Sequence, residues 1–399
     1  MRVFQRGRSF CCVAALVTVC ALLLAGCGVL TPGIEAEASP TPPTTDPLPT
    51  PPPTPSPTPT PEPTPEPTPA PVLAEFTGQV EHLFFHPAIY DPEYAFGRWN
   101  AEDLDAWMVT TGEYEKMLQS IYEKGFILVH LTDVYEETTV DGAARMVRKP
   151  LLLPEGKKPL VISFDDVNYY QYMRESAIVY KLILGDDGEI WDYSIDPDGT
   201  AHVTQERDIV TILDAFVREH PDFFWRGAKG TIGLTGYEGI LGYHTFGESE
   251  NRASEIEAVK PIIARLKETG WDFASHTFGH PDLKVISLGR LQHDADRWQE
   301  EVEPLIGPTP VLLYPYGADP QKDAAKMDYL LGKGFRMFCA VGKESYVRID
   351  KTIPAVFMDR RHPDGTTLRA HRSQYLDLYD AQEVFDPARP DTLPVDFSK

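Results

Sequence analysis

The sequence predicts an α/β fold, namely a (β/α) barrel of about seven or eight strands with inserted loops. Three observations indicate it. From about Phe76 onward, short apolar runs alternate with amphipathic helical segments, the order expected of parallel strands joined by crossover helices. Several runs are apolar without alternation, as in strands covered on both faces. The stretch 76–399 has the length of one large domain, and this many strands can close a barrel.

Eight mainly apolar runs are expected to form the strands. In chain order they are 79–85, 126–131, 160–164, 228–234, 271–274, 311–314, 335–341 and 353–358. The stretch 181–205, rich in Asp and Gly, interrupts this order and is expected to be an inserted hairpin or loop. The glycine-rich run 236–247 is expected to be a second long loop.

Two of the expected helices have clear start signals. Thr110 and Glu113 have the spacing of a capping box, and Gly125 is expected to end that helix. Ser287 is expected to cap a helix before a face of apolar residues.

Two further helices have less distinct boundaries. The apolar face within 209–217 predicts a helix that ends before Pro221. Ser254 and Glu257 are expected to open another helix, in which Pro261 implies a kink or a later start.

The first 27 residues have the order of a secretory signal. Three arginines precede the apolar run 10–24, which is shorter than a comfortable membrane span. The run closes on Leu-Ala-Gly-Cys27, which resembles the lipobox of bacterial lipoproteins. This resemblance implies cleavage before Cys27, lipid attachment to its sulfur, and a domain anchored at the outer face of the cytoplasmic membrane. An ordinary signal peptide that happens to contain Gly-Cys is the alternative.

A Pro/Thr-rich linker is expected over 28–75. Its repeats of Pro, Thr and Glu contain almost no apolar side chains, so they cannot bury a core. At about 3.1 Å per residue, roughly 40 polyproline-like residues extend on the order of 120 Å. Such a spacer suits a domain that works within a cell-wall layer, or one simply held clear of the lipid surface.

The folded part is acidic. The whole chain has a formal net charge of −23, and most of that charge lies outside the signal and the linker. An acidic surface argues against nucleic-acid binding and favours a neutral or cationic substrate. Of the five cysteines, only Cys339 lies beyond the first 27 residues, so no disulfide is expected within a mature chain and Cys339 is expected to be a core residue.

Two pairs of residues carry the chemistry. Asp165 and Asp166 directly follow one apolar run, and His276 and His280 follow another, so all four are expected at the C-terminal rim of the barrel. Asp166, His276 and His280 are expected to bind a divalent metal and leave one coordination position for water. Asp165 then remains to accept a proton from that water.

Each of these pairs is a weak signal by itself. The spacing His-x-x-x-His arises easily by chance in a chain with 11 histidines. Asp186 and Asp187 are also adjacent, but glycines flank them and an exposed turn is expected there. The pair Asp165-Asp166 differs because a strand precedes it, and burying adjacent carboxylates without a cation is costly.

These segments resemble the polysaccharide deacetylase family, which includes chitin and peptidoglycan deacetylases. Residues 163–166 resemble the family's Thr-Phe-Asp-Asp motif, 275–283 its second motif and 314–317 its third. The front part, 84–133, resembles the branch that acts on poly-β-1,6-N-acetylglucosamine. The resemblance covers most of 83–361.

The resemblance implies hydrolysis of acetamido groups in an N-acetylglucosamine polymer. Zinc is the family's usual metal, although a carboxylate with two imidazoles also admits other first-row metals. By the resemblance, Asp165 acts as the base and the backbone N–H of Tyr316 faces the oxyanion. His86 protonates the departing amine, with His362 and His371 as the alternatives for that role.

Two departures from the family pattern leave another function open. Val167 stands where the family commonly has Gly, and Leu313 stands where many members have the Arg that orients the base. We assign this orienting role to Arg361, with the adjacent Arg360 as the alternative. If neither replaces it, a catalytically impaired protein that binds cell-wall polysaccharide is the alternative function, and hydrolysis of a different amide on the same metal is a third.

Aromatic residues on expected loops either stack on sugar faces or pack on their own domain. They are Tyr169, Tyr170, Trp191, Tyr237 and Tyr243. The sequence contains nothing that predicts the oligomeric state.

Overall fold

The computed structural model describes residues 71–391 and 394–398. The predicted signal peptide, Cys27 and most of the predicted linker lie outside the described residues, and their roles stay predictions. Within the described ranges, no helix has the length and apolar character needed to cross a membrane.

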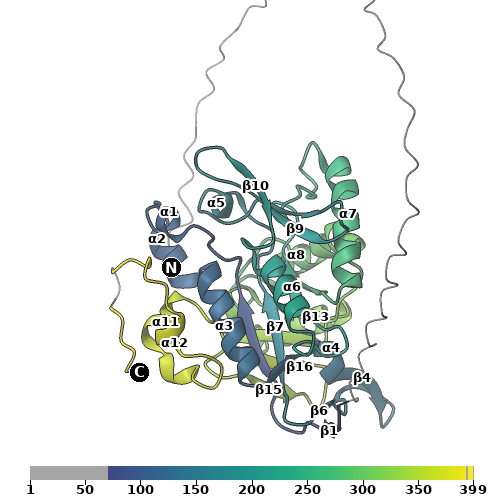
Figure 1. Cartoon of the computed structure of the whole chain (residues 1–399). Coiled ribbons are helices and arrows are strands. Elements are labelled where there is room, and N and C mark those ends of the chain that lie inside the picture. The colour runs from purple at the N-terminus through teal and green to yellow at the C-terminus, as the bar shows by residue number, and fades with distance from the viewer. Residues whose placement is uncertain (1–70, 392–393, 399) are drawn as a thin grey trace, which may run out of the picture. The chain divides into compact units, whose positions relative to one another are not determined.

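A curled parallel sheet forms the centre of the folded part (Figure 1). Its wall runs, in spatial order, through β2 (Glu81–Phe85), β7 (Lys158–Phe164), β11 (Thr231–Leu234), β12 (Asp272–Ser275), β13 (Val311–Leu313), β14 (Met337–Val341) and β16 (Val356–Arg360). Two backbone hydrogen bonds join the end of β16 to β2: Phe84 N–H donates to Arg361 O (3.0 Å), and Arg361 N–H donates to His82 O (2.9 Å). The sheet therefore closes on itself, and the predicted (β/α) barrel is confirmed.

Two more strands lie beside this wall. β3 (Phe126–Leu128) runs parallel to the start of β7, and β15 (Tyr346–Ile349) runs antiparallel to β16. Each expected strand coincides with an observed one, with its ends shifted by a few residues.

Side chains along the barrel strands alternate between the interior and the helical layer. Val161, Leu313 and Met358 point inward and pack in one buried cluster, whereas Phe357 packs in the outer cluster beneath the helices. Arg360 continues the inward row of β16. Cys339 is buried in the same inner cluster, as expected of a core residue.

Helices cover the outside of the sheet. Their bounds are α1 (Pro92–Ala95), α2 (Ala101–Trp107), α3 (Thr111–Glu123), α4 (Leu131–Val134), α5 (Gln171–Arg174), α6 (Ile209–Glu219), α7 (Arg252–Glu268), α8 (Leu288–Glu301), α9 (Glu303–Ile306), α10 (Ala324–Gly332), α11 (Gly365–Ala370) and α12 (Ala381–Val384), with 3₁₀ turns η1 (Pro315–Gly317) and η2 (Arg372–Gln374).

Three of the expected helix starts can be compared with the structure. The capping box at Thr110 is present, and Ser287 caps α8. The expected start of α7 at Ser254 is wrong, because the helix begins after Asn251 and the Ser254 hydroxyl bonds back to the Asn251 carbonyl. Pro261 lies within α7 on its exposed side, where water can satisfy the carbonyl that proline leaves free.

Three small antiparallel sheets interrupt the barrel pattern. The expected insertion is confirmed as a three-stranded sheet of β8 (Lys181–Leu184), β9 (Ile190–Ile195) and β10 (Ala201–Thr204). β1 (Leu73–Glu75) pairs with β6 (Leu152–Pro154), so the expected end of the linker at residue 75 is wrong by a few residues. The hairpin of β4 (Tyr135–Val140) and β5 (Ala143–Arg148) was not expected. Its turn, Asp141-Gly142, has positive φ at both residues, which is the Asp-Gly signal of a two-residue hairpin.

Candidate active site

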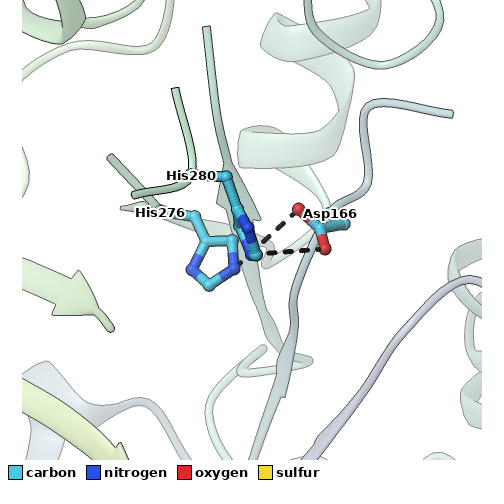
Figure 2. Close-up of side chains that lie close together, drawn as sticks. All are labelled: Asp166, His276 and His280. Carbon is cyan, nitrogen blue, oxygen red and sulfur yellow. Dashed lines mark ion pairs between the residues drawn. The ribbon is translucent and has the colours of Figure 1, made fainter. Parts of the chain in front are cut away.

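The expected metal ligands meet at the C-terminal rim of the barrel. Asp166 follows β7, and His276 and His280 follow β12. One ligand atom from each residue lies within 4.8 Å of the others. His276 Nε2 is 3.8 Å from Asp166 Oδ1, and His280 Nε2 is 3.8 Å from Asp166 Oδ2 (Figure 2). The fold thus brings together three side chains from two distant segments.

This set of donors fits a divalent metal. A tetrahedral ion with ligands at about 2.0–2.1 Å needs ligand atoms about 3.4 Å apart. The two 3.8 Å separations exceed that spacing slightly, so binding of an ion would draw the two imidazoles closer to Asp166. One carboxylate and two imidazoles leave a coordination position for water, which is the pattern of a catalytic site and not of a structural one.

The two histidines are oriented for binding. His276 Nδ1 lies 2.9 Å from Leu313 O, and because a carbonyl only accepts, Nδ1 must carry the proton and Nε2 is left to bind a metal. Burial lowers the pKa of His280 and so favours the neutral imidazole that a metal requires. The ring of His280 packs edge to face against Tyr316 at 4.6 Å.

Asp166 accepts a hydrogen bond from Tyr170, a residue that was not expected to contact the metal site. The Tyr170 hydroxyl donates to Asp166 Oδ1 at 2.7 Å and lies 2.7 Å from Thr235 Oγ1. Burial would raise the pKa of Asp166, but His280 and His276 hold it below its ordinary value. Asp166 has a φ of 63°, in the left-handed region, so local backbone conformation also aims this carboxylate.

Asp165 forms an ion pair with a buried arginine. Arg360 Nη1 donates to Asp165 Oδ1 at 2.7 Å, and Nη2 donates to Oδ2 at 2.9 Å. The guanidinium is fully buried, also donates to Ser163 Oγ, and lies over the Phe84 ring at 4.2 Å. Burial would raise the pKa of Asp165, but Arg360 and His276 hold it well below its usual range. Asp165 is therefore ionised at neutral pH.

The assignment of the orienting role to Arg361 is wrong, and Arg360 occupies that position. Arg361 pairs instead with Glu81 at 3.0 Å and with Asp377 at 3.0 Å. The physical reason is the alternation of side chains along β16, which turns residue 360 into the barrel and residue 361 away from it. The Arg360 guanidinium on β16 therefore contacts Asp165 in place of the arginine that the family commonly has at position 313.

His86 follows β2 and lies on the opposite side of the site from β12. Its Nδ1 is 3.2 Å from Trp107 O. Its ring packs edge to face against His362, with centroids 4.9 Å apart. Burial and the neighbouring His362 lower the pKa of His86 to about 4, against the opposing effect of Asp166 and Asp165. His86 is therefore neutral at neutral pH and has to take up a proton before it donates one.

A second candidate acid lies beside it. His362 stacks on Phe84 at 4.1 Å, and its Nδ1 is 3.0 Å from Asp364 Oδ2. Its Nε2 is buried and has no hydrogen-bond partner within 71–391 and 394–398. His371, the third candidate, contacts Gln374 next to η2 and is not part of this pair.

Tyr316 lies next to the candidate ligand His280, with the two ring centroids 4.6 Å apart. It lies in the η1 turn directly after β13 with a φ of 58°. No acceptor in the described part of the chain takes its backbone N–H. A backbone N–H without an acceptor is the kind of donor that stabilisation of an oxyanion needs.

Most of the expected sugar-contacting aromatics pack inside the domain. Tyr169, Tyr170 and Tyr243 are buried, so these three do not offer a face to a ligand. Trp191 lies on the inserted sheet, where its Nε1 donates to Asp187. Tyr237 is 44% exposed, and its ring lies 5.1 Å from that of Tyr170.

Comparison with known proteins agrees with the resemblance seen in the motifs. Residues 245–332 match the family model described as polysaccharide deacetylase. No curated protein matches the chain. Among solved structures, the chain is similar to the Streptococcus pyogenes deacetylase PplD in complex with acetate, at 14% identity and a TM-score of 0.40, over 75% of this chain and 95% of that one. It is also similar to IcaB from Ammonifex degensii, at 14% identity and a TM-score of 0.39, over 72% and 93%.

The matched range contains both candidate histidine ligands and Tyr316. The family match confirms the resemblance to polysaccharide deacetylases and the prediction of a hydrolase that acts on amide bonds of a polysaccharide. Members of this family generally use a metal, and Asp166, His276 and His280 form a site for one.

Proposed function

We propose that this chain, whose residues 245–332 match polysaccharide deacetylases, uses a bound divalent metal to remove N-acetyl groups from an N-acetylglucosamine polymer of the cell envelope. The observation that carries the proposal is a pair of adjacent buried carboxylates in different settings. Asp166 lies 3.8 Å from each of two histidines, whereas Asp165, although 3.9 Å from His276, is paired with a buried arginine at 2.7 Å. One carboxylate is thereby suited to bind a cation and the other to accept a proton.

The chain's own groups divide the reaction between them. When bound by Asp166, His276 and His280, a metal lowers the pKa of its water and polarises the acetamido carbonyl. Asp165 accepts the proton that the attacking water loses. Hydrolysis forms a bond between the water oxygen and the acyl carbon and breaks the C–N bond. The acyl group leaves as acetate, and the nitrogen of the sugar gains a proton.

Two groups act on the other atoms of the amide. The Tyr316 N–H is available to stabilise the charge that develops on the carbonyl oxygen. Neutral His86 takes up a proton from solvent water and delivers it to the departing amine, and Asp165 returns the proton it accepted to solvent after acetate leaves. We propose zinc as the metal, since the donor set of one carboxylate and two imidazoles suits it.

The two departures from the family pattern do not remove a part of the site, which favours an enzyme over a binding protein. Val167 is fully buried, and its side chain packs in the outer hydrophobic cluster. The missing Arg at Leu313 is replaced by Arg360 from another strand.

We also propose that the domain is held at the outer face of the cytoplasmic membrane through a lipid on Cys27, with the Pro/Thr-rich stretch as a spacer. The Leu-Ala-Gly-Cys sequence supports this proposal. Metabolic labelling with a fatty acid should mark the wild-type chain and not Cys27→Ser. Equal labelling of both chains would contradict lipidation at this residue.

Acetate release from N-acetylglucosamine oligomers by the zinc-loaded chain tests the proposed activity. Asp165→Asn should keep its zinc, because Asp165 is not a ligand, yet lose at least about 100-fold in kcat. Asp186→Asn, in the exposed turn of the inserted sheet, is the matched control and should release acetate like the wild type. Acetate release by Asp165→Asn at the wild-type rate would remove Asp165 from the role of base.

A further inference from the structure

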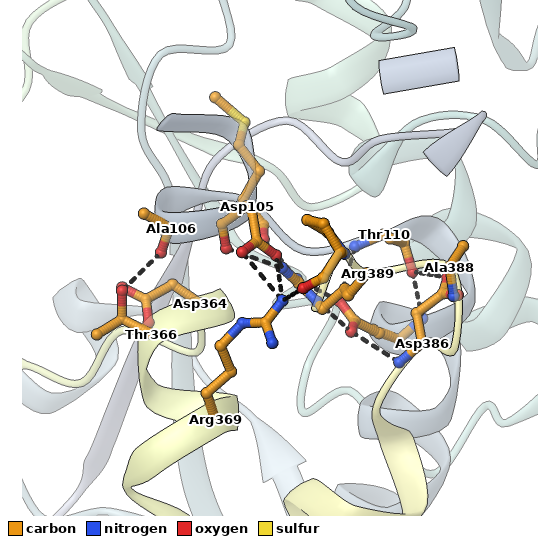
Figure 3. Close-up of polar contacts among 12 residues, drawn as sticks. Asp105, Ala106, Thr110, Asp364, Thr366, Arg369, Asp386, Ala388 and Arg389 are labelled. Carbon is orange, nitrogen blue, oxygen red and sulfur yellow. Dashed lines mark hydrogen bonds and ion pairs between the residues drawn. The ribbon is translucent and has the colours of Figure 1, made fainter. Parts of the chain in front are cut away.

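Residues 364–389, called here the C-terminal segment, pack against the end of α2 beside the barrel (Figures 1 and 3). Helix α2 ends at Trp107, and the last carbonyls of a helix have no partner within it. The buried guanidinium of Arg389 donates hydrogen bonds to two backbone carbonyls at this end of the helix. Its Nη1 donates to Asp105 O at 2.8 Å, and its Nη2 donates to Met108 O at 2.7 Å.

The two carbonyls between these acceptors are also taken by side chains. The Thr366 hydroxyl donates to Ala106 O at 3.2 Å. His86 Nδ1 lies 3.2 Å from Trp107 O and must donate, since a carbonyl oxygen only accepts. The end of α2 is therefore shared between the C-terminal segment and the histidine of the active site.

A cluster of buried ion pairs fixes this arrangement (Figure 3). Arg389 also contacts Glu113 through Nε and Nη2, at 2.7 Å each, and Asp105 Oδ1 at 2.9 Å. Arg369 contacts both carboxylate oxygens of Asp105, at 2.8 and 3.0 Å. All four residues are at most 4% exposed. Buried charges are costly unless they are paired with good geometry, so the cluster tolerates little displacement.

Gly365, the first residue of α11, shows how closely the segment approaches. A Cβ at this position would lie 1.7 Å from Asp105 O. Only glycine permits this contact between the backbone of α11 and the end of α2. Asp364, which caps the same helix, contacts His362, so the start of α11 also adjoins the second candidate acid.

We propose that the C-terminal segment is a positioning element for His86: through Arg389 and Thr366 it holds the end of α2 so that the Trp107 carbonyl accepts Nδ1–H and leaves Nε2 to carry the transferred proton. The negative end of the α2 dipole adds to the preference for a proton on Nδ1. This inference rests on the proposed deacetylase function. It assigns Arg389 and Thr366 roles that are exerted through His86.

Arg389→Lys tests the proposal. Lysine keeps the charge, but its single ammonium group cannot donate at once to the two backbone carbonyls and the carboxylate that the planar guanidinium contacts. We expect kcat for acetate release to fall about tenfold, less than the roughly 100-fold or greater loss expected on removal of a general acid. KM and zinc content should stay unchanged, and the limb of the kcat–pH profile assigned to His86 should move. Arg372→Lys, in the same segment but paired with Asp380, is the matched control and should change none of these.

The tautomer of His86 gives a readout that does not depend on activity. In histidine ¹⁵N spectra of the full chain, with the His86 signals identified from His86→Gln, the wild type should show the Nδ1–H form. Arg389→Lys and Thr366→Val should both show an increased Nε2–H fraction, and Thr366→Ser should restore the wild-type ratio. Thr269→Val, which removes a hydroxyl bond to a carbonyl on α7, is the control for the threonine variants.

An unchanged tautomer ratio in both Arg389→Lys and Thr366→Val would overturn the proposal. So would a loss of kcat in Arg389→Lys with an unaltered pH profile, since that indicates a purely structural role. If the wild-type chain releases no acetate, the proposed function fails, while the tautomer spectra still decide whether the segment orients His86.

Discussion

The two sides of the candidate site are built in different ways. The metal side comprises residues carried by the ends of barrel strands, namely Asp165, Asp166, His276, His280 and Arg360. The acid side comprises His86 and His362 with the helix ends that surround them. Hydrogen bonds between parallel strands fix the metal side, whereas the acid side is fixed by the end of α2 and its contacts with Arg389, which lies 284 residues beyond Asp105.

This difference separates two kinds of failure. A change on the metal side alters the affinity for the ion or the ionisation of the base. A change in the C-terminal segment leaves the ion in place and disturbs proton delivery to the amine. Variants of the two sides should therefore differ in their metal content and in the pH dependence of their activity. The substituted residues also lie in different parts of the chain.

Removal of the metal has the largest expected effect. Dialysis against a chelator should abolish acetate release, and added zinc should restore it, because a bound metal would both activate the water and polarise the amide. Arg389→Lys should regain its own activity at the same zinc concentration as the wild type, since its defect lies on the acid side. Undiminished acetate release by protein that elemental analysis finds free of metal would contradict the account.

Loss of Arg360 should have the next largest effect. Arg360→Leu leaves Asp165 buried without its guanidinium, so the pKa of Asp165 should rise, because burial then dominates. The base must be ionised to act, so the acidic limb of the kcat/KM profile should move to higher pH, with a loss of about 100-fold at neutral pH. An acidic limb at the wild-type position would show that Arg360 does not set the ionisation of the base.

Loss of the Tyr170 hydroxyl should weaken the metal without affecting the acid side. Tyr170→Phe removes the hydrogen bond to Asp166, and such outer partners of ligands typically contribute about 10–100-fold to metal affinity. Competition titration with a chromophoric chelator measures the change. Tyr243→Phe, whose hydroxyl contacts the Leu182 carbonyl, is the control. Equal zinc affinity of Tyr170→Phe and wild type would contradict the role given to Tyr170.

Arg361 should have the smallest effect on activity, despite its place next to Arg360. Arg361→Gln removes a buried guanidinium from its ion pairs with Glu81 and with the half-exposed Asp377, so the cost in stability should lie between the ~1 kcal/mol of an exposed pair and the ~3 kcal/mol of a fully buried one. Urea unfolding should show this decrease in the free energy of unfolding, with acetate release by the folded protein unchanged. A large loss of activity would show that β16 presents both arginines to the site.

The metal side could be predicted from the sequence because its residues directly follow apolar strands. Position at a strand end and chemical type together pointed to Asp166, His276 and His280 as a group, and the resemblance to the family's motifs made this prediction specific. The choice between Arg360 and Arg361 depends on the alternation of side chains along β16. Val356 and Met358 point into the barrel, so the next side chain on that face belongs to Arg360.

The acid side could be predicted only in part. His86 was found by resemblance, but its partner Trp107 and the anchor Arg389 lie in segments whose contact depends on tertiary packing. Nothing local marks Arg389 as buried, since an arginine in a polar C-terminal stretch is usually exposed. The β4–β5 hairpin is different, because its Asp-Gly turn was a readable signal.

Anomalous diffraction at the zinc edge, from crystals of the zinc-loaded protein, tests the central claim most directly. The account predicts one strong peak at about 2.0–2.2 Å from an oxygen of Asp166 and from Nε2 of both His276 and His280. Asp165 should remain outside bonding distance and paired with Arg360. A peak bound by Asp165, or no peak among these residues, would contradict the account.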